Sequence, residues 1–128
     1  MSEFKWLSTE AVLAMHARQL AEHGGGAGLR DAGLLDSALQ HPLNKAGYGA
    51  PDVFDLAAAY AYGIARNHPF IDGNKRTALV ASRSFLIING YQITASKEDR
   101  LTTFLRLAAG EMPEDELGQW FRRWAAPR

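Results

Sequence analysis

The sequence predicts an all-α protein, a single domain over residues 1–128 in which about six helices surround a central buried helix. Three observations support this fold class. Apolar residues recur along most of the chain with the spacing of one face of an α-helix. Glycines, prolines and cap-forming residues divide these stretches. The length of 128 residues is enough to bury one core. Residues 4–7 and 91–94 could form short strands, but nothing in them requires a sheet.

Three helices are expected before residue 68. Ser8 can cap the first, and the glycines at 24–26 should end it. Asp31 can begin the second helix, which Pro42 should end. Asp52 can begin the third, which leads directly into a polar stretch. The positions with the spacing of one helical face are Val12, Leu13, His16, Leu20, Leu34, Leu35, Ala38, Leu39, Leu56, Ala59, Tyr60 and Ile64.

Three more helices are expected after the polar stretch. A nearly continuous apolar run predicts the central helix at about residues 75–89, buried on most sides and ended by Gly90. Ser96 can begin the next helix, which Gly110 should end, and Pro113 fits the first position of the last one. The inward-facing positions expected here are Leu101, Phe104, Leu105, Ala108, Leu117, Trp120, Phe121 and Trp124.

The polar stretch is His-Pro-Phe-Ile-Asp-Gly-Asn-Lys-Arg at positions 68–76. It combines a base, a carboxylate, an amide and two cations, a density that packing alone does not require. Pro69 disfavours helical geometry at His68, and Asp72-Gly73 is a turn dipeptide. The chain should therefore leave one helix at His68 and enter the next near Asn74, which is expected to be its N-cap.

These residue types at a helix start predict an anion site. Lys75 and Arg76 would lie in the first helical turn, where the helix dipole disfavours cations and unpaired N–H groups attract anions. Gly73 lets the backbone approach a phosphate, and Arg76 adds a forked donor. Asp72 is explained if Mg²⁺ bridges its carboxylate and the phosphate. His68 remains as the general base. The alternative, a set of ordinary helix-end residues, is acceptable for each residue alone but not for all of them together.

This stretch resembles the signature of the Fic (filamentation induced by cAMP) superfamily, His-x-Phe-x-(Asp/Glu)-(Gly/Ala)-Asn-(Gly/Lys)-Arg. Nearly the whole chain is similar to its Doc (death-on-curing) branch, the toxins of type II toxin–antitoxin systems. The resemblance implies a helical Fic/Doc domain that uses ATP and Mg²⁺. His68 matches the catalytic base that takes a proton from a hydroxyl of a target protein, and Asp72 matches the residue that holds Mg²⁺ on the nucleotide phosphates. Asn74 and Arg76 match phosphate-holding residues, and Gly73 matches the anion-binding loop.

Lys75 bears on which group is transferred. Most Fic enzymes have glycine at this position and transfer AMP, whereas the Doc branch has lysine, binds the nucleotide reversed and transfers the γ-phosphate. A lysine adds volume and a point charge that glycine lacks, so the pose of ATP should differ. The resemblance therefore implies a protein serine/threonine kinase. Because Gly73 is what AMP-transferring members carry, protein adenylylation remains an alternative, as does a silent Fic fold that only binds a partner.

The resemblance also implies two protein partners. The substrate would be translation elongation factor Tu, phosphorylated on a threonine so that protein synthesis stalls. The inhibitor would be a Phd-type antitoxin whose C-terminal segment binds as a helix in a groove on the toxin. The family's inhibitory motif, (Ser/Thr)-x-x-x-Glu-(Gly/Asn), has no full match, since Asp99 follows the segment from Thr94 to Glu98. Inhibition in trans is therefore favoured.

Composition narrows the remaining function classes. The formal net charge is zero, with 14 basic and 14 acidic residues, which disfavours direct binding of nucleic acid. No apolar run approaches the roughly twenty residues of a membrane span, no export signal is evident and no cysteine is present, so a cytoplasmic protein is expected. His16, His23 and His41 lack metal-ligand spacing and are expected at the surface or at caps. Residues 24–28 are expected to be a flexible connector.

Overall fold

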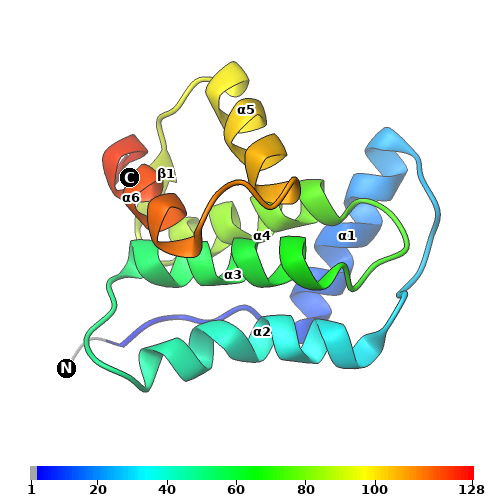
Figure 1. Ribbon diagram of the computed structural model, residues 1–128, viewed down its shortest axis with the longest axis horizontal. Helices are drawn as coiled ribbons and strands as arrows, with labels where there is room; N and C mark the ends of the chain where they lie inside the picture. The colour runs from blue at the N-terminus through cyan, green and yellow to red at the C-terminus, as the bar shows by residue number, and fades with distance from the viewer. Residues whose placement is uncertain (1–2) are drawn as a thin grey trace.

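The computed structural model describes residues 3–128, which fold as six helices and one small sheet around a shared hydrophobic core. The helices are α1 (Thr9–His23), α2 (Ala32–Ala46), α3 (Val53–Asn67), α4 (Asn74–Ile88), α5 (Lys97–Ala108) and α6 (Glu114–Trp124). In Figure 1, α3 crosses the middle of the molecule, with α2 on one side and α5 and α6 on the other. The helical fold expected from the sequence is confirmed.

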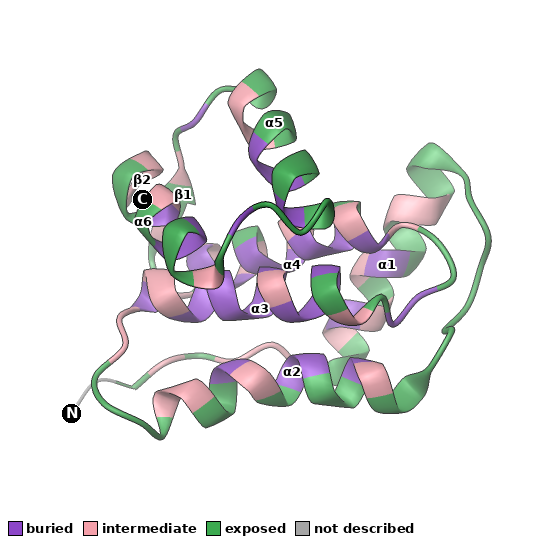
Figure 2. Ribbon diagram, viewed as in Figure 1, coloured by how far each residue is buried: buried purple, intermediate pink, exposed green. Residues whose placement is uncertain are grey.

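The most deeply buried helix is α3, whereas the sequence pattern placed the central helix at residues 75–89. Alanines fill α3, and it packs against α2, α4 and α6 (Figure 2). Alanine has the highest helix propensity, and its small side chain lets neighbouring helices approach closely. Asp52 caps α3 in a reciprocal capping box with Asp55. By contrast, α4 exposes Arg83 and Ile88. Residues 75–89 are therefore less completely buried than the sequence pattern predicted.

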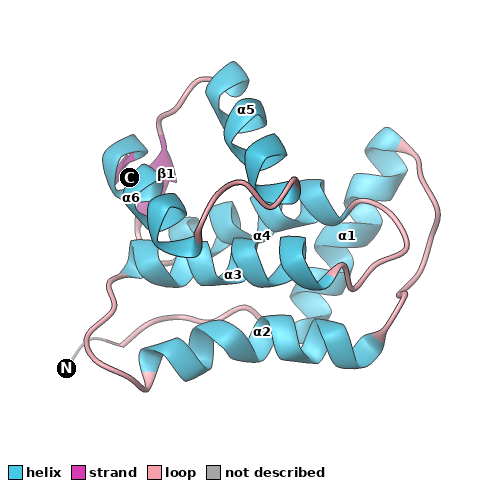
Figure 3. Cartoon of the chain, viewed as in Figure 1, coloured by secondary structure: helices cyan, strands magenta, loops and turns pink. Residues whose placement is uncertain are grey.

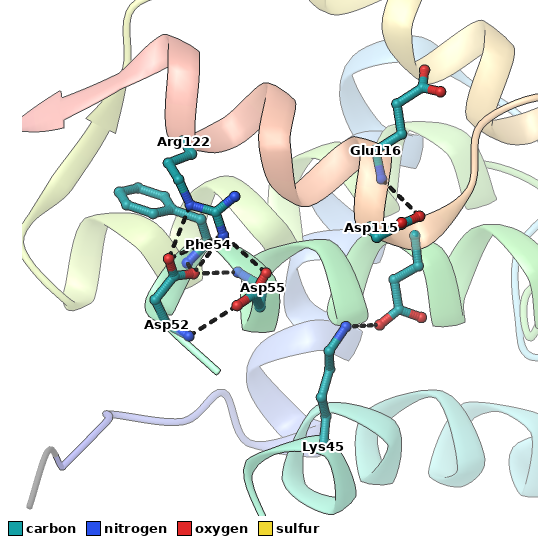
Figure 4. Close-up of polar contacts among 8 residues, drawn as sticks. Lys45, Asp52, Phe54, Asp55, Asp115, Glu116 and Arg122 are labelled. Carbon is teal, nitrogen blue, oxygen red and sulfur yellow. Dashed lines mark hydrogen bonds and ion pairs between the residues drawn. The ribbon is translucent and has the colours of Figure 1, made fainter. Parts of the chain in front are cut away.

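A carboxylate cluster with Arg122 ties the start of α3 to α6 (Figure 4). The Arg122 guanidinium donates to both Asp52 oxygens at 3.0 and 3.1 Å and to Asp55 Oδ1 at 2.9 Å. Burial alone would raise the pKa of Asp52, but the hydrogen bonds and charge of Arg122 and the Asp55 backbone N–H lower it below its usual value. The cluster therefore favours the ionised form of Asp52 in the folded protein.

The sheet has two short strands, β1 (Tyr91–Ile93) and β2 (Ala125–Pro127) (Figure 3). They pair antiparallel, with Gln92 opposite Ala126. One of the two possible strands read from the sequence, at residues 91–94, is thus realised. Residues 4–7 form no strand; instead the Leu7 backbone N–H donates to the buried Tyr60 hydroxyl at 3.1 Å.

Pro42 does not end α2, which continues to Ala46. Proline removes one intrahelical hydrogen bond but can be kept inside a helix when tertiary contacts hold the turns beyond it. Here the carboxylate of Glu114 on α6 accepts hydrogen bonds from Lys45 Nζ at 2.6 Å and from His41 Nε2 at 2.7 Å. These contacts anchor the last turns of α2 to the start of α6.

The inward face of α5 also differs from the prediction. Leu101 and Leu105 are 48% and 55% exposed, and Ala108 is exposed, whereas Thr103 and Leu107 are buried beside Phe104. The helix contacts α3 and α4 through a narrow stripe, so only part of its apolar surface enters the core. On α6, Phe121 is buried, but Trp120 and Trp124 are only partly buried. Pro113 is the residue before the first turn of α6 rather than its first position.

Within residues 3–128, none of the helices has the length and apolar character needed to cross a membrane.

Candidate active site

The polar stretch forms the loop between α3 and α4, as its sequence predicts. α3 ends at Asn67 and is followed by His68 in the left-handed conformation, with φ 50° and ψ 56°. Gly73 is also left-handed, with φ 79° and ψ 16°, and directly precedes α4. Pro69 and Phe70 are buried, whereas the side chains of His68 and Asp72 are exposed. The loop therefore has an apolar anchor and an exposed polar edge.

Arg30 holds the end of α3, a role that the sequence did not indicate. Its Nε donates to the His68 carbonyl at 2.7 Å, and its Nη2 donates to the Asn67 carbonyl at 2.8 Å. A cation is favourable where the last carbonyls of a helix lack partners. The guanidinium thus fixes the backbone at His68, a non-glycine residue with positive φ.

Asn74 is not the N-cap of α4, because Gly73 occupies that position and Asn74 is the first helical residue. The Asn74 side chain is buried, with 7% exposure, and folds back over the loop. Its Oδ1 accepts the Phe70 N–H at 3.0 Å, and its Nδ2 donates to the Phe70 carbonyl at 2.9 Å. Asn74 therefore clamps both backbone groups of the residue that anchors the loop in the core.

The same amide also approaches the His68 ring. The Phe70 N–H can only donate, so it fixes which end of the Asn74 amide is oxygen and directs Nδ2 toward His68 Nδ1, at 3.4 Å. A donor at Nδ1 places the proton of the neutral ring on Nε2. At 3.4 Å this bond is long and therefore weak, so it restrains the ring without fixing one tautomer. The His68 side chain is exposed, and the contact with Asn74 restrains its ring only weakly.

The start of α4 presents unpaired donors to a cleft. No side chain among residues 3–128 caps this end, and the first intrahelical bond runs from the Thr77 N–H to the Gly73 carbonyl at 2.9 Å. Neither Lys75 nor Arg76 forms an ion pair with a carboxylate of the described residues. The cleft has a volume of about 360 Å³, and its walls include His68 and both cations. Such a helix start is an anion site.

Asp72 lies at the edge of the cleft and receives two backbone N–H groups. Its Oδ1 accepts from Gly73 at 2.7 Å and its Oδ2 from Gly26 at 3.4 Å. Residues 3–128 hold no group of three or more His, Cys, Asp or Glu side chains suited to a metal. A cation beside Asp72 would take its other ligands from a bound phosphate or from water, which suits Mg²⁺.

Residues 24–31 pack along the loop, and they include the segment 24–28 that was expected to be a flexible connector. The Pro69 carbonyl accepts from the N–H groups of Arg30 at 2.7 Å and Asp31 at 3.1 Å, and the Gly28 carbonyl accepts from the Ile71 N–H at 3.1 Å. A side chain at position 25 would place its Cβ only 2.7 Å from Asp72 Oδ2. The glycines thus allow a second segment to lie against the motif.

His16 is buried, not at the surface as the lack of metal spacing suggested. It is 4% exposed, and its ring stacks on Phe70 with centroids 3.7 Å apart and planes 8° from parallel. Its Nε2 lies 2.7 Å from the Asp72 carbonyl oxygen, which can only accept, so Nε2 carries a proton. The helical spacing placed His16 on one face of the helix with Val12 and Leu20, but it gave no sign of this contact.

The chain is similar to a known protein family and to two of its characterised members. The model of the Fic/DOC family matches residues 6–86, a range that holds the whole loop and most of α4. Toxin Doc of Mycolicibacterium smegmatis is 48% identical over 75 residues, which are 56% of this chain and 57% of that protein, so the chain spans just over half the length of this relative. Protein kinase doc of Escherichia phage P1 is 32% identical over 118 residues, 91% of this chain and 93% of that protein.

Proposed function

Because the chain belongs to the Fic/DOC family and resembles Doc toxins, we propose that residues 1–128 act as one domain of a toxin that phosphorylates a protein. In this proposal the γ-phosphate of ATP is transferred to a threonine hydroxyl of translation elongation factor Tu. The observation that carries it is the cleft at the start of α4, where unpaired N–H groups, Lys75 and Arg76 lie beside an exposed histidine.

The proposal gives each residue of the site a role, which its position supports. The N–H groups at the start of α4 and the Arg76 fork would bind the oxygens of the transferred phosphoryl group. Asp72 would hold Mg²⁺ against the nucleotide phosphates, and Mg²⁺ bound there would neutralise part of their charge. Asn74 supports the site mainly by holding the Phe70 backbone, since both ends of its amide are already engaged there. Phosphoryl transfer depends mainly on such positioning and charge stabilisation.

His68 lines two clefts, which leaves room for both substrates of a transfer reaction. The second cleft has a volume of about 520 Å³, and its walls include His68, Leu107, Met112 and Pro113. In an in-line displacement the attacking and leaving oxygens lie on opposite sides of phosphorus. With the phosphate at α4, a hydroxyl that His68 deprotonates would approach from the second cleft. This arrangement is consistent with His68 as the base.

Transfer of AMP is the competing chemistry, and one assay separates it from kinase activity. The protein is incubated with elongation factor Tu and ATP labelled at either the α- or the γ-phosphate. Label from the γ position on the factor supports the kinase, label from the α position supports the AMP transferase, and labelling from neither position contradicts both. If elongation factor Tu stays unlabelled but γ label appears on another protein in a parallel incubation with cell lysate, the kinase proposal stands and the proposed substrate is wrong.

The base assignment has its own test. His68→Ala should reduce transfer by a factor of about 10²–10⁴, the usual contribution of a general base, while Mg·ATP still binds. The matched control is His23→Ala, because His23 is an exposed histidine at the end of α1 with no contact to the cleft. A His68→Ala protein that keeps near-full activity would exclude histidine as the base.

We further propose that a Phd-type antitoxin inhibits the protein in trans through a C-terminal helix. The naming of the mycobacterial relative as a toxin supports a neutralising partner in general. Co-expression with a candidate antitoxin gene should restore growth of cells that produce the chain. An antitoxin truncated before its C-terminal segment should fail to do so.

A further inference from the structure

Most backbone carbonyl groups of the site loop accept a hydrogen bond. The carbonyls of His68, Pro69 and Phe70 accept from Arg30, from the backbone at 30–31 and from Asn74, respectively. The Gly73 carbonyl accepts from the Thr77 N–H. A carbonyl oxygen turned into the cleft would repel a phosphate, and each of these bonds holds one carbonyl oxygen on a protein donor instead.

The Asp72 carbonyl is the one that the local chain leaves most free to turn. It precedes Gly73, and glycine adopts positive and negative φ about equally well, so the peptide plane between residues 72 and 73 has no strong intrinsic preference. One restraint is the bond from the Gly73 N–H to Asp72 Oδ1. That restraint weakens when the carboxylate turns toward a cation. The remaining restraint is His16 on α1.

We infer that His16 is a positioning residue of the nucleotide site, which locks the 72–73 peptide plane so that its carbonyl points away from the bound phosphate. The Nε2–H of His16 donates to this carbonyl at 2.7 Å, and the ring is held by stacking on the buried Phe70. His16 also lies against Gly73, since a Cβ there would be 3.6 Å from its Nε2. The inference rests on the proposed binding of a nucleotide phosphate at α4.

Two substitutions of His16 separate the effect of its hydrogen bond from the effect of its ring packing. His16→Phe keeps a flat ring for stacking but removes the donor, whereas His16→Gln keeps an N–H donor at a similar reach without the ring. If the lock acts as inferred, His16→Phe should weaken binding of Mg·ATP about 5- to 30-fold, the usual effect of losing one buried hydrogen-bond partner, and raise KM more than it lowers kcat. His16→Gln should recover most of the affinity. His23→Phe is the control on the same helix and should behave as wild type.

The measurement is isothermal titration of each folded variant with Mg·ATP, with circular dichroism to verify helix content. Equal affinity in wild type and His16→Phe would overturn the inference while leaving the proposed function intact. Equal losses in His16→Phe and His16→Gln would also overturn it, because packing and not the donor would then matter. Absence of Mg·ATP binding in the wild type would instead remove the proposed function and the inference with it.

One observation needs no variant. In ¹⁵N-labelled wild-type protein, the His16 ring should carry its proton on Nε2, and that proton should exchange slowly with water. Should His16→Phe fail to fold, this spectrum still tests the hydrogen bond on which the inference depends. A ring protonated only on Nδ1, or an Nε2 proton that exchanges as fast as that of His23, would overturn the inference.

Discussion

Substitution of Gly25 by alanine tests whether residues 24–28 position the carboxylate of Asp72. The new Cβ would lie 2.7 Å from Asp72 Oδ2, and ordinary contact begins near 3.4 Å, so the carboxylate must retreat by roughly 0.7 Å. The side chain is exposed and flexible, so it should move before the backbone does. A magnesium ion demands near-ideal geometry, with oxygens at about 2.0–2.1 Å. We therefore expect Gly25→Ala to weaken binding of Mg·ATP about tenfold or more, a loss of about 1.4 kcal/mol or more.

The control for this prediction is Gly24→Ala. Gly24 has φ 77° and ψ −178°, a region nearly exclusive to glycine, and Gly25 has φ 123°. Alanine at either position should therefore cost about 1–3 kcal/mol of folding stability through backbone strain. A Cβ at position 24, however, meets nothing within 4 Å. The midpoint temperature of thermal unfolding should thus fall by a similar amount in both variants, whereas their affinities for Mg·ATP should differ. The reasoning is refuted if Gly25→Ala binds as tightly as Gly24→Ala.

Three further outcomes are expected. Lys75→Gly should move label transfer from the γ- toward the α-phosphate, and an unchanged γ preference would remove Lys75 as the selector. Because the folded-state pKa of Asp52 is lowered, its contribution to stability is present above its unfolded pKa of about 3.9 and is lost as pH falls through the folded value. The urea midpoint should therefore fall less steeply with acid in Arg122→Ala, although the effect is small because the pair is 43% and 45% exposed. Tyr60→Phe should lower the unfolding free energy by about 1–3 kcal/mol, because it strands the part-buried N–H of Leu7, and an unchanged urea midpoint would contradict this.

The sequence predicted those features of the site that depend on neighbouring residues. Pro69 and the Asp72-Gly73 pair define where α3 stops and α4 starts, because backbone preferences act locally. The burial of Phe70, 1% exposed, also agrees with its place in the motif. One local expectation was wrong. Asn74 is a common N-cap type, but the left-handed Gly73 takes that position, which frees the Asn74 amide to bind the Phe70 backbone.

Contacts across the chain were not predictable from one sequence. His16 lies 56 positions from the carbonyl that it binds, and Arg30 lies 38 positions from His68. A histidine on an apolar face and an arginine after a glycine run each have many ordinary explanations. Only the packing of α1 and of residues 24–31 beside the loop gives them specific partners. The same holds for Pro42, since the bonds to Glu114 that hold the end of α2 come from a helix late in the chain.

The residues of the motif and the residues that reach it from distant parts of the chain contribute differently to the site. In the proposed function, the motif supplies the donors for a phosphate, namely the helix start, Lys75 and Arg76. The same loop also contains carbonyl oxygens, which compete for these donors and repel an anion. Segments outside the motif occupy several of them, with Arg30 on His68 and His16 on Asp72. A chain with an intact motif but without these partners would keep every matching residue and lose the orientation of the backbone that binds the phosphate. Affinity for Mg·ATP should therefore depend on residues 16 and 30 as well as on the motif itself.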